Sequence, residues 1–194
     1  MDHFVLFHLN ALLVDHDGIE DPVRAYVQAS EALFAVGLLL VVVVGAIRGR
    51  INLIAAGLSA GVSTVLALLI GKGISSLVDR PRPFVSHPRG IHLFVHHASD
   101  PGFPSDHATA AFAIATALWL RERRIGTVAL IGAAILSAGR VALGVHWPSD
   151  VIAGAALGTA CALLCARFAR PLVESVAGFL ARSRTTKPFG QFSH

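Results

Sequence analysis

The sequence predicts an all-α fold, a polytopic membrane helix bundle of about five transmembrane helices preceded by a helix at the membrane interface. Of the 194 residues, 54% are hydrophobic and only 14% are charged. A soluble domain of ordinary composition carries about a quarter charged residues. Long apolar runs recur along the chain, and lipid requires their backbone groups to be satisfied within helices. The length indicates one membrane-embedded domain over residues 1–194.

Five segments are long and apolar enough to be predicted as spans, and they cover residues 24–47, 53–78, 106–120, 126–143 and 148–168. The third is short, so we expect it to lie against the other helices. The apolar stretch before the first span is too short to cross a bilayer, and it predicts an interfacial amphipathic helix over about residues 3–14. The chain after residue 171 starts amphipathic and is predicted to end in a polar tail over 183–194.

The positions of the basic residues predict the orientation of the chain. Basic residues follow the first, third and fifth spans, at 48–50, 121–124 and 167–187, and five spans place all three groups on one side. The positive-inside rule makes that side cytoplasmic, together with the C-terminus. The loops 80–105 and 144–147 then face the periplasm or the exterior of a cell membrane. Because the net charge of +4 lies in these short clusters, we expect no nucleic-acid partner.

Three polar clusters lie in or beside the two outer loops. They comprise Arg80 and Arg82, then Ser105, Asp106 and His107, and finally Arg140, His146 and Asp150. Ionisable groups near a membrane are costly and favour a functional interpretation. Taken singly, the arginines and His146 could be interfacial anchors, while the serine and the aspartates could cap or complement helix starts. Their occurrence together on one side of the membrane favours a shared site.

The residue types in these clusters suit phosphoryl transfer, which needs cations and backbone donors around three equatorial oxygens. Arg82 and Arg140 can supply planar forks, and the helix start at Ser105 offers free N–H groups and a hydroxyl. His146 can act as a nucleophile if a carboxylate holds its second ring nitrogen, and Asp150 follows four residues later. His107 remains as the candidate proton donor to the leaving group.

At these residues the sequence resembles the type 2 phosphatidic acid phosphatase superfamily. The family has a Lys-x6-Arg-Pro motif, a Pro-Ser-Gly-His motif and a Ser-Arg-x5-His-x3-Asp motif. The third is matched from Arg140 through His146 to Asp150, the second by residues 104–107, and the first at its end by Arg82 and Pro83. These catalytic motifs lie within about residues 72–154.

The sequence departs from the family pattern at three positions. Ser75 stands at the position of the family lysine, so Lys72, one helical turn earlier on the same face, or Arg80 is a candidate for that role, unless no residue fills it. Gly139 replaces the serine before Arg140, and Asp106 replaces the family glycine. With Asp106 and the Arg-Pro-Arg-Pro-Phe run, the chain is similar to bacterial undecaprenyl-diphosphate phosphatases of the bacitracin-resistance type.

The resemblance implies a hydrolase that removes the terminal phosphate of undecaprenyl diphosphate, which recycles the lipid carrier for cell-wall synthesis and gives bacitracin resistance. It implies that His146 attacks phosphorus with the help of Asp150, that His107 protonates the leaving group, and that water hydrolyses the phosphohistidine. It assigns phosphate binding to Arg82, Arg140 and Ser105, with Asp106, Lys72 and Arg80 as further candidates. It implies no metal and no other cofactor.

Two other interpretations remain open. The same chemistry could act on phosphatidylglycerophosphate or phosphatidate, or the chain could be a non-catalytic lipid transporter or scaffold. The loop over residues 86–103 is long and punctuated by glycine and proline, so it is a candidate lid over the site. Its histidines are expected to face solvent, and they are His87, His92, His96 and His97.

Overall fold

The computed structural model describes residues 2–182, which contain helices and no strand. The helices are α1 (Asp2–Val14), α2 (Asp17–Ile47), α3 (Ile51–Val78), α4 (Pro83–Ser86), α5 (Asp106–Arg121), α6 (Arg123–Ala142), α7 (Pro148–Phe168) and α8 (Arg170–Arg182). The predicted all-α fold is therefore confirmed. The polar tail predicted over 183–194 lies outside the described residues.

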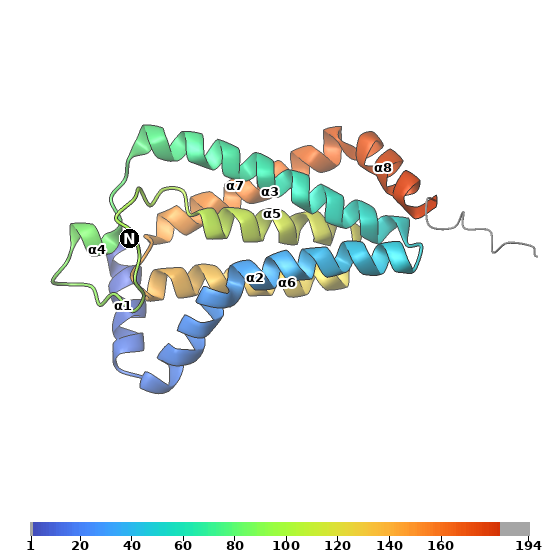
Figure 1. The fold of residues 1–194 in the computed structure, drawn as a ribbon. Helices are drawn as coiled ribbons and strands as arrows, with labels where there is room; N and C mark the ends of the chain where they lie inside the picture. Colours follow the sequence, from blue (N-terminus) through green and yellow to red (C-terminus); the bar gives the residue numbers. More distant parts are fainter. Residues whose placement is uncertain (1, 183–194) are drawn as a thin grey trace, which may run out of the picture.

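Four of the described helices, α2, α3, α6 and α7, are long and apolar enough to cross a membrane. Helix α5 has 16 residues, so at a rise of 1.5 Å per residue it is only about 24 Å long. It runs along the other helices and contacts α3, α6 and α7, as its short length predicted (Figure 1). The chain is a multi-pass membrane protein, and about five spans agree with this arrangement.

Helix α2 begins earlier than the span predicted from residue 24. Its first turns carry charged side chains that pair along the helix surface, with Arg24 bound to Glu20 at 3.3 Å and to Asp21 at 2.7 Å. Pairs at this spacing stabilise a helix without making it apolar. The hydropathy pattern therefore located the apolar part of α2 and missed its polar start.

Small residues allow α5 and α7 to pack closely at the polar end of the bundle. A Cβ atom on Gly158 would lie 2.2 Å from the carbonyl oxygen of Thr109, and one on Gly154 would lie 2.6 Å from that of Ser105. The backbone N–H of Ser105 also donates to the carbonyl oxygen of Asp150 at 3.0 Å. The starts of α5 and α7 are thereby fixed side by side, and both carry predicted site residues.

Helix α1 lies across the end of the bundle (Figure 1). The amide of Asn10, which is buried, donates to the carbonyl oxygens of His92 and Ala142, both at 2.8 Å. The predicted helix is confirmed, but its predicted amphipathic pattern is wrong. Apolar side chains lie on both faces of the helix, since Leu6 is buried whereas Phe4 is 66% exposed.

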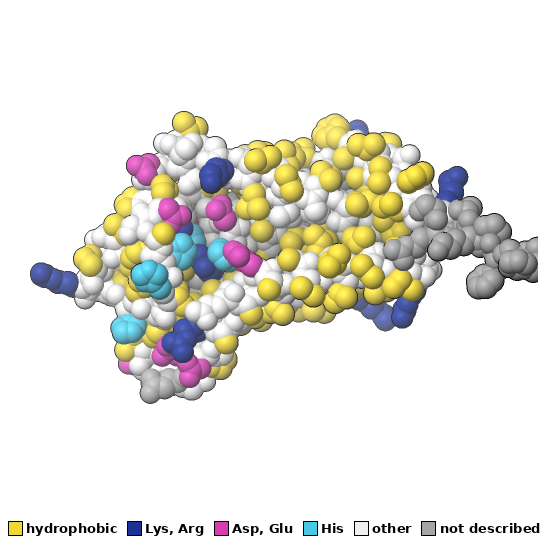
Figure 2. Space-filling view, viewed as in Figure 1, with side chains coloured by type: hydrophobic (Ala, Val, Ile, Leu, Met, Phe, Trp, Pro, Cys, Tyr) yellow, Lys and Arg dark blue, Asp and Glu magenta, His cyan; other side chains and the backbone are white. Residues whose placement is uncertain are grey.

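The surface is divided along the long axis of the molecule. In Figure 2, histidine and charged side chains gather at the end that carries α1, hydrophobic side chains cover the flanks, and further basic side chains lie at the opposite end. The flanks include Leu39 of α2 and Leu69 of α3, which are 61% and 68% exposed. A broad apolar belt between two polar ends fits a helix bundle surrounded by lipid.

Candidate active site

The polar end of the bundle contains a cavity of about 400 Å³. It is bordered by residues of α2, α3, α5, α6, the loop that follows α4, and the segment between α6 and α7. The predicted site residues in its lining are Lys72, Arg82, Asp106, His107, Arg140 and His146. The structure therefore brings together, in one place, most of the residues that the three sequence clusters contributed.

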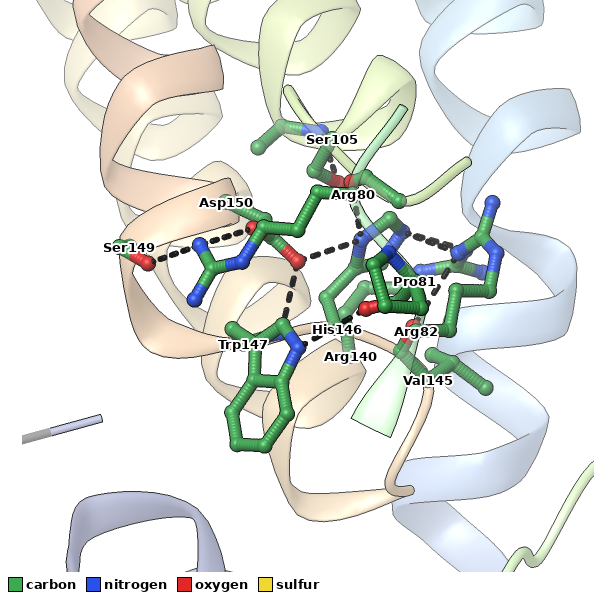
Figure 3. A network of polar contacts seen from close by, with 12 residues as sticks. Arg80, Pro81, Arg82, Ser105, Arg140, Val145, His146, Trp147, Ser149 and Asp150 are labelled. Carbon is green, nitrogen blue, oxygen red and sulfur yellow. Dashed lines mark hydrogen bonds and ion pairs between the residues drawn. The ribbon is translucent and has the colours of Figure 1, made fainter. Parts of the chain in front are cut away.

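His146 lines this cavity, and its hydrogen bonds define its tautomer. Its Nε2 lies 3.0 Å from Nη1 of Arg82 and 3.0 Å from Nη2 of Arg140, and its Nδ1 lies 3.0 Å from the carbonyl oxygen of Gly102 (Figure 3). Guanidinium groups can only donate, so Nε2 is the acceptor and Nδ1 carries the hydrogen. Burial, followed by the charges of Arg140 and Arg82, holds the pKa of His146 well below 6.5. The ring is therefore neutral, with its lone pair on Nε2.

Asp150 lies beside the same ring, at the third position of α7. Its Oδ2 accepts a hydrogen bond from the backbone N–H of Trp147 at 2.9 Å and lies 3.6 Å from Nδ1 of His146. The sequence led us to expect a direct hydrogen bond between the carboxylate and the ring. The distance is too long for one, and the Gly102 carbonyl takes that place, so Asp150 acts on the ring through its charge.

Arg140 is buried and has an unpaired donor. Its Nη2 bonds to His146 and lies 3.1 Å from Nε2 of His97, whereas its Nε is buried without a hydrogen-bond partner among the described residues. An unsatisfied buried donor on a cation is costly. Because Arg140 lines the cavity, its guanidinium is a candidate ligand for an anion.

The guanidinium of Arg82 is bound by Asp100, a residue that we did not predict. Nε of Arg82 donates to the backbone oxygen of Asp100 at 3.0 Å, and Nη2 lies 3.2 Å from Oδ2 of the same residue. Burial acts to raise the pKa of Asp100, but the hydrogen bond and charge of Arg82 outweigh it and lower the pKa below its ordinary value of 3.8. An ionised carboxylate thus lies on the fork that a phosphoryl group would use.

The loop histidines divide into two groups. His92 and His96 are exposed, as expected, but His97 lines the cavity and accepts a hydrogen bond from Arg140. His87 also departs from the expectation, because its ring packs edge-on against Trp147 at 5.7 Å. Within residues 2–182, no group of three or more His, Cys, Asp or Glu side chains could hold a metal ion.

Glu31 of α2 is a second lining residue that the sequence reasoning missed. Its Oε1 lies 2.9 Å from Nε2 of His107. A signal was available, because Glu31 is the charged residue within the apolar run of residues 25–47. Ionisable residues inside such runs deserve a functional interpretation by default.

Two predicted phosphate ligands, Ser105 and Arg80, do not belong to the lining of the cavity. Ser105 is fully buried, and its Oγ accepts from the backbone N–H of Ala108 at 3.5 Å as the cap of α5. Arg80 instead forms ion pairs with Asp150 at 2.8 Å and with Asp2 of α1 at 3.0 Å. The start of α5 still borders the cavity, so its positive dipole end faces the position of an anion.

An apolar groove of about 580 Å³ adjoins the polar cavity. The two share Glu31, Lys72, Asp106 and His107. Beyond these, the groove is bordered mostly by apolar residues of α2, α3 and α5, including Phe34, Leu38, Val65, Leu68 and Ile114. This combination suits an amphiphile whose charged head and apolar tail occupy adjoining spaces.

The family model described as the PAP2 superfamily matches residues 56–173 of the chain. The chain belongs to the PAP2 superfamily. The resemblance inferred from the sequence motifs is therefore confirmed, and as a member of this superfamily the chain is a hydrolase that acts on lipid phosphates.

Known PAP2 proteins resemble this chain over most of its length. It is 30% identical over 186 residues to the undecaprenyl-diphosphatase BcrC of Bacillus subtilis, which covers 92% of this chain and 93% of that protein. It is 34% identical over 183 residues to the decaprenylphosphoryl-5-phosphoribose phosphatase of Mycobacterium tuberculosis, with 93% of each chain covered. The crystal structure of LpxE from Aquifex aeolicus matches with a TM-score of 0.64 at 23% identity, over 84% of this chain and 93% of that one. That structural match supports the fold.

Proposed function

We propose that this PAP2 protein is an undecaprenyl-diphosphate phosphatase, which removes the terminal phosphate and recycles the lipid carrier. The convergence of Arg82 and Arg140 on the lone pair of His146 carries the proposal. Two guanidinium groups around a buried neutral nucleophile suit a phosphoryl group. The adjoining apolar groove supports a lipid tail, and the similarity to the Bacillus subtilis undecaprenyl-diphosphatase supports the diphosphate.

In the first step, Nε2 of His146 attacks the terminal phosphorus, and the bond to the bridging oxygen breaks. Arg82 and Arg140 hold the equatorial oxygens, and the substrate displaces Asp100 from the Arg82 fork. The imidazole becomes positively charged when phosphorus binds to Nε2 while hydrogen remains on Nδ1. The Gly102 carbonyl at 3.0 Å and the Asp150 carboxylate at 3.6 Å stabilise that charge.

His107 gives a proton to the departing lipid monophosphate, and Glu31 holds the ring by its Nε2 before the reaction. Lys72 and Asp106 line both the cavity and the groove, so we expect them beside the proximal phosphate, with the lysine balancing its charge. A water molecule then attacks the phosphohistidine and gives a proton back to His107, the bond between phosphorus and Nε2 of His146 breaks, and inorganic phosphate leaves with both histidines restored. Each turnover consumes one water molecule and yields lipid monophosphate and phosphate.

The distribution of arginines supports a site that faces the periplasm or the exterior. The end of the bundle opposite the cavity carries the arginines of the α2–α3 connection, the α5–α6 connection and α8. By the positive-inside rule we expect that end, together with the C-terminus, on the cytoplasmic side. An outward site has access to the leaflet on which the diphosphate carrier is released during cell-wall synthesis.

A second candidate substrate is a polyprenyl-phosphoryl sugar phosphate. The similarity to the Mycobacterium tuberculosis decaprenylphosphoryl-5-phosphoribose phosphatase, at 34% identity and 93% coverage, favours it. It shares a polyprenyl phosphate with the first candidate but presents a phosphate monoester rather than an anhydride. The same cavity chemistry would apply to both.

The test is phosphate release by the purified full chain in detergent, with EDTA present. Undecaprenyl diphosphate is compared with decaprenylphosphoryl-5-phosphoribose, phosphatidylglycerophosphate and phosphatidate. We expect the highest kcat/KM on undecaprenyl diphosphate, loss of turnover by several orders of magnitude in His146→Ala, and normal turnover in the control His96→Ala, whose ring is exposed in the loop. A higher kcat/KM on another lipid would replace the substrate, and an active His146→Ala protein would refute the mechanism.

A further inference from the structure

The first turn of α1 is bonded to Arg80 and Ser149, which lie beside the carboxylate of Asp150. Asp2 forms an ion pair with Nη2 of Arg80 at 3.0 Å and accepts a hydrogen bond from the hydroxyl of Ser149. Both partners in turn adjoin Asp150. This cluster lies outside the lining of the cavity, so its members do not touch the phosphate directly.

Arg80 connects Asp2 to Asp150. Its Nη1 donates to Oδ1 of Asp150 at 2.8 Å and to Oγ of Ser149 at 2.6 Å, and its guanidinium carbon lies 5.5 Å from the centre of the Trp147 ring. Figure 3 shows this guanidinium on the side of the Asp150 carboxyl group that faces away from His146. Arg80 is therefore a clamp on the far oxygen of the carboxylate.

This clamp determines the direction of the other carboxylate oxygen. Oδ2 of Asp150 points to the backbone N–H of Trp147 and to Nδ1 of His146, at 2.9 and 3.6 Å. Because the two oxygens rotate together about one carbon–carbon bond, fixing Oδ1 against Arg80 fixes Oδ2 near the ring. The guanidinium is itself held from its other side by Asp2, so the position of Arg80 depends on both carboxylates.

We propose that Asp2 and Arg80 are positioning residues for the phosphatase reaction, acting through Asp150 on the imidazole of His146. The inference rests on the proposed roles of His146 and Asp150. It makes α1 part of the catalytic unit, although α1 lies before the residues 56–173 that the family model matches. It also reassigns Arg80 from a phosphate ligand to a support.

The charge of Asp2 is suited to this role. Burial acts to raise the pKa of Asp2, but hydrogen bonds from Ser149 and Arg80 outweigh it and lower the pKa below its ordinary value of 3.8. Asp2 is thus ionised at neutral pH and shares the positive charge of Arg80 with Asp150. Without Asp2, the guanidinium would act on Asp150 alone and would reduce the negative potential available to the imidazolium that forms during attack.

Anchoring of α1 to the bundle is a separate function that a different residue provides. Asn10 ties the middle of α1 to His92 and Ala142, and Leu6 is fully buried beneath the helix. Asp2 makes no contact with these residues in the described hydrogen-bond network. A neutral isostere at Asp2 should therefore leave α1 in place while weakening the grip on Arg80.

The experiment compares Asp2→Asn with Asp2→Glu and with Asp15→Asn, which removes the same charge from the exposed residue that directly follows α1. Each full-length protein is assayed for kcat and KM on undecaprenyl diphosphate and for its melting temperature. We expect Asp2→Asn to lower kcat roughly 10- to 100-fold, as small displacements of a catalytic group do, with KM and melting temperature unchanged. Asp2→Glu should recover part of the loss, and Asp15→Asn should match the wild type.

The same measurement in an Arg80→Gln background tests the connection. If Asp2 acts through Arg80, Asp2→Asn causes no further loss of kcat in that background. A kcat of Asp2→Asn within twofold of the wild type, or an equal loss in both backgrounds, would overturn the inference. Wild-type turnover that His146→Ala abolishes would leave the proposed function intact in either case, so the two failures are distinguishable.

Discussion

Arg140 offers the most direct test of the phosphate-binding geometry. Its Nη2 faces Nε2 of His146 at 3.0 Å, and its buried Nε has no partner among the described residues. We expect these two donors to bind the transferred phosphoryl group. Charge-assisted hydrogen bonds contribute about 1.5–3 kcal/mol each, so Arg140→Ala should cost about 3–6 kcal/mol of transition-state binding. At about 1.4 kcal/mol per tenfold, kcat/KM should fall roughly 10²- to 10⁴-fold.

The assay is phosphate release from undecaprenyl diphosphate, with kcat/KM measured for Arg140→Ala, Arg140→Lys and the control Arg24→Ala. Lysine keeps the charge but loses the planar fork, so Arg140→Lys should lie between the wild type and Arg140→Ala. Arg24 pairs with Glu20 and Asp21 on the surface of α2, and its removal should change the rate less than twofold. A folded Arg140→Ala protein whose kcat/KM stays within tenfold of the wild type would refute the assignment.

Three further outcomes are expected. The pKa of His146 lies below 6.5, so its neutral form persists as the pH falls through 6.5. After correction for substrate ionisation, the loss of kcat/KM at acidic pH that is due to His146 should therefore occur below pH 6.5. A loss that begins above pH 6.5 would contradict this. Asp100→Asn removes the carboxylate that competes with phosphate for the guanidinium of Arg82, so the inhibition constant of inorganic phosphate should fall severalfold. A rise in that constant would show that the carboxylate assists phosphate binding. Gly158→Val forces side-chain atoms against the Thr109 carbonyl and should destabilise the bundle by about 3 kcal/mol or more, which would be seen as a lower melting temperature. The control Gly73→Ala should leave the melting temperature unchanged, because a Cβ atom there would have no neighbour within 4 Å beyond its own stretch of helix backbone.

The sequence was sufficient to predict the N-terminal helix, the five apolar helices of the bundle and the end of the bundle at which the candidate site residues lie, but not the short α4 or α8. Hydropathy located the apolar runs, and their number placed Arg82, His107, Arg140 and His146 at one end. The spacing from His146 to Asp150 also predicted correctly that the carboxylate lies near the ring, because the first turn of α7 begins at Pro148.

The different destinations of Arg80 and Arg82 depend on backbone geometry that composition does not reveal. Arg82 has φ −66° and ψ 157°, close to polyproline II values, between two prolines. That conformation has three residues per turn, so side chains two residues apart point in different directions. One arginine reaches the cavity, and the other reaches Asp150.

The contacts of Asp2, His97 and Asp100 were not predictable from periodicity. Asp2 meets Arg80 across 78 positions and Ser149 across 147 positions of the chain, with no local pattern that announces either contact. His97 and Asp100 lie in a loop without regular structure, whose path is set by where its ends are held. The contacts of such residues follow from the tertiary structure and cannot be inferred from the sequence pattern of one segment.

The joining of the polar cavity to the apolar groove has a kinetic consequence. The four shared residues, Glu31, Lys72, Asp106 and His107, let a lipid keep its chain among the helices while its head group reacts. We therefore expect substrate to arrive by two-dimensional diffusion within a leaflet, without entering water. Turnover should follow the mole fraction of substrate in the micelle or bilayer, so diluting it with inert detergent at a fixed total concentration should slow the enzyme.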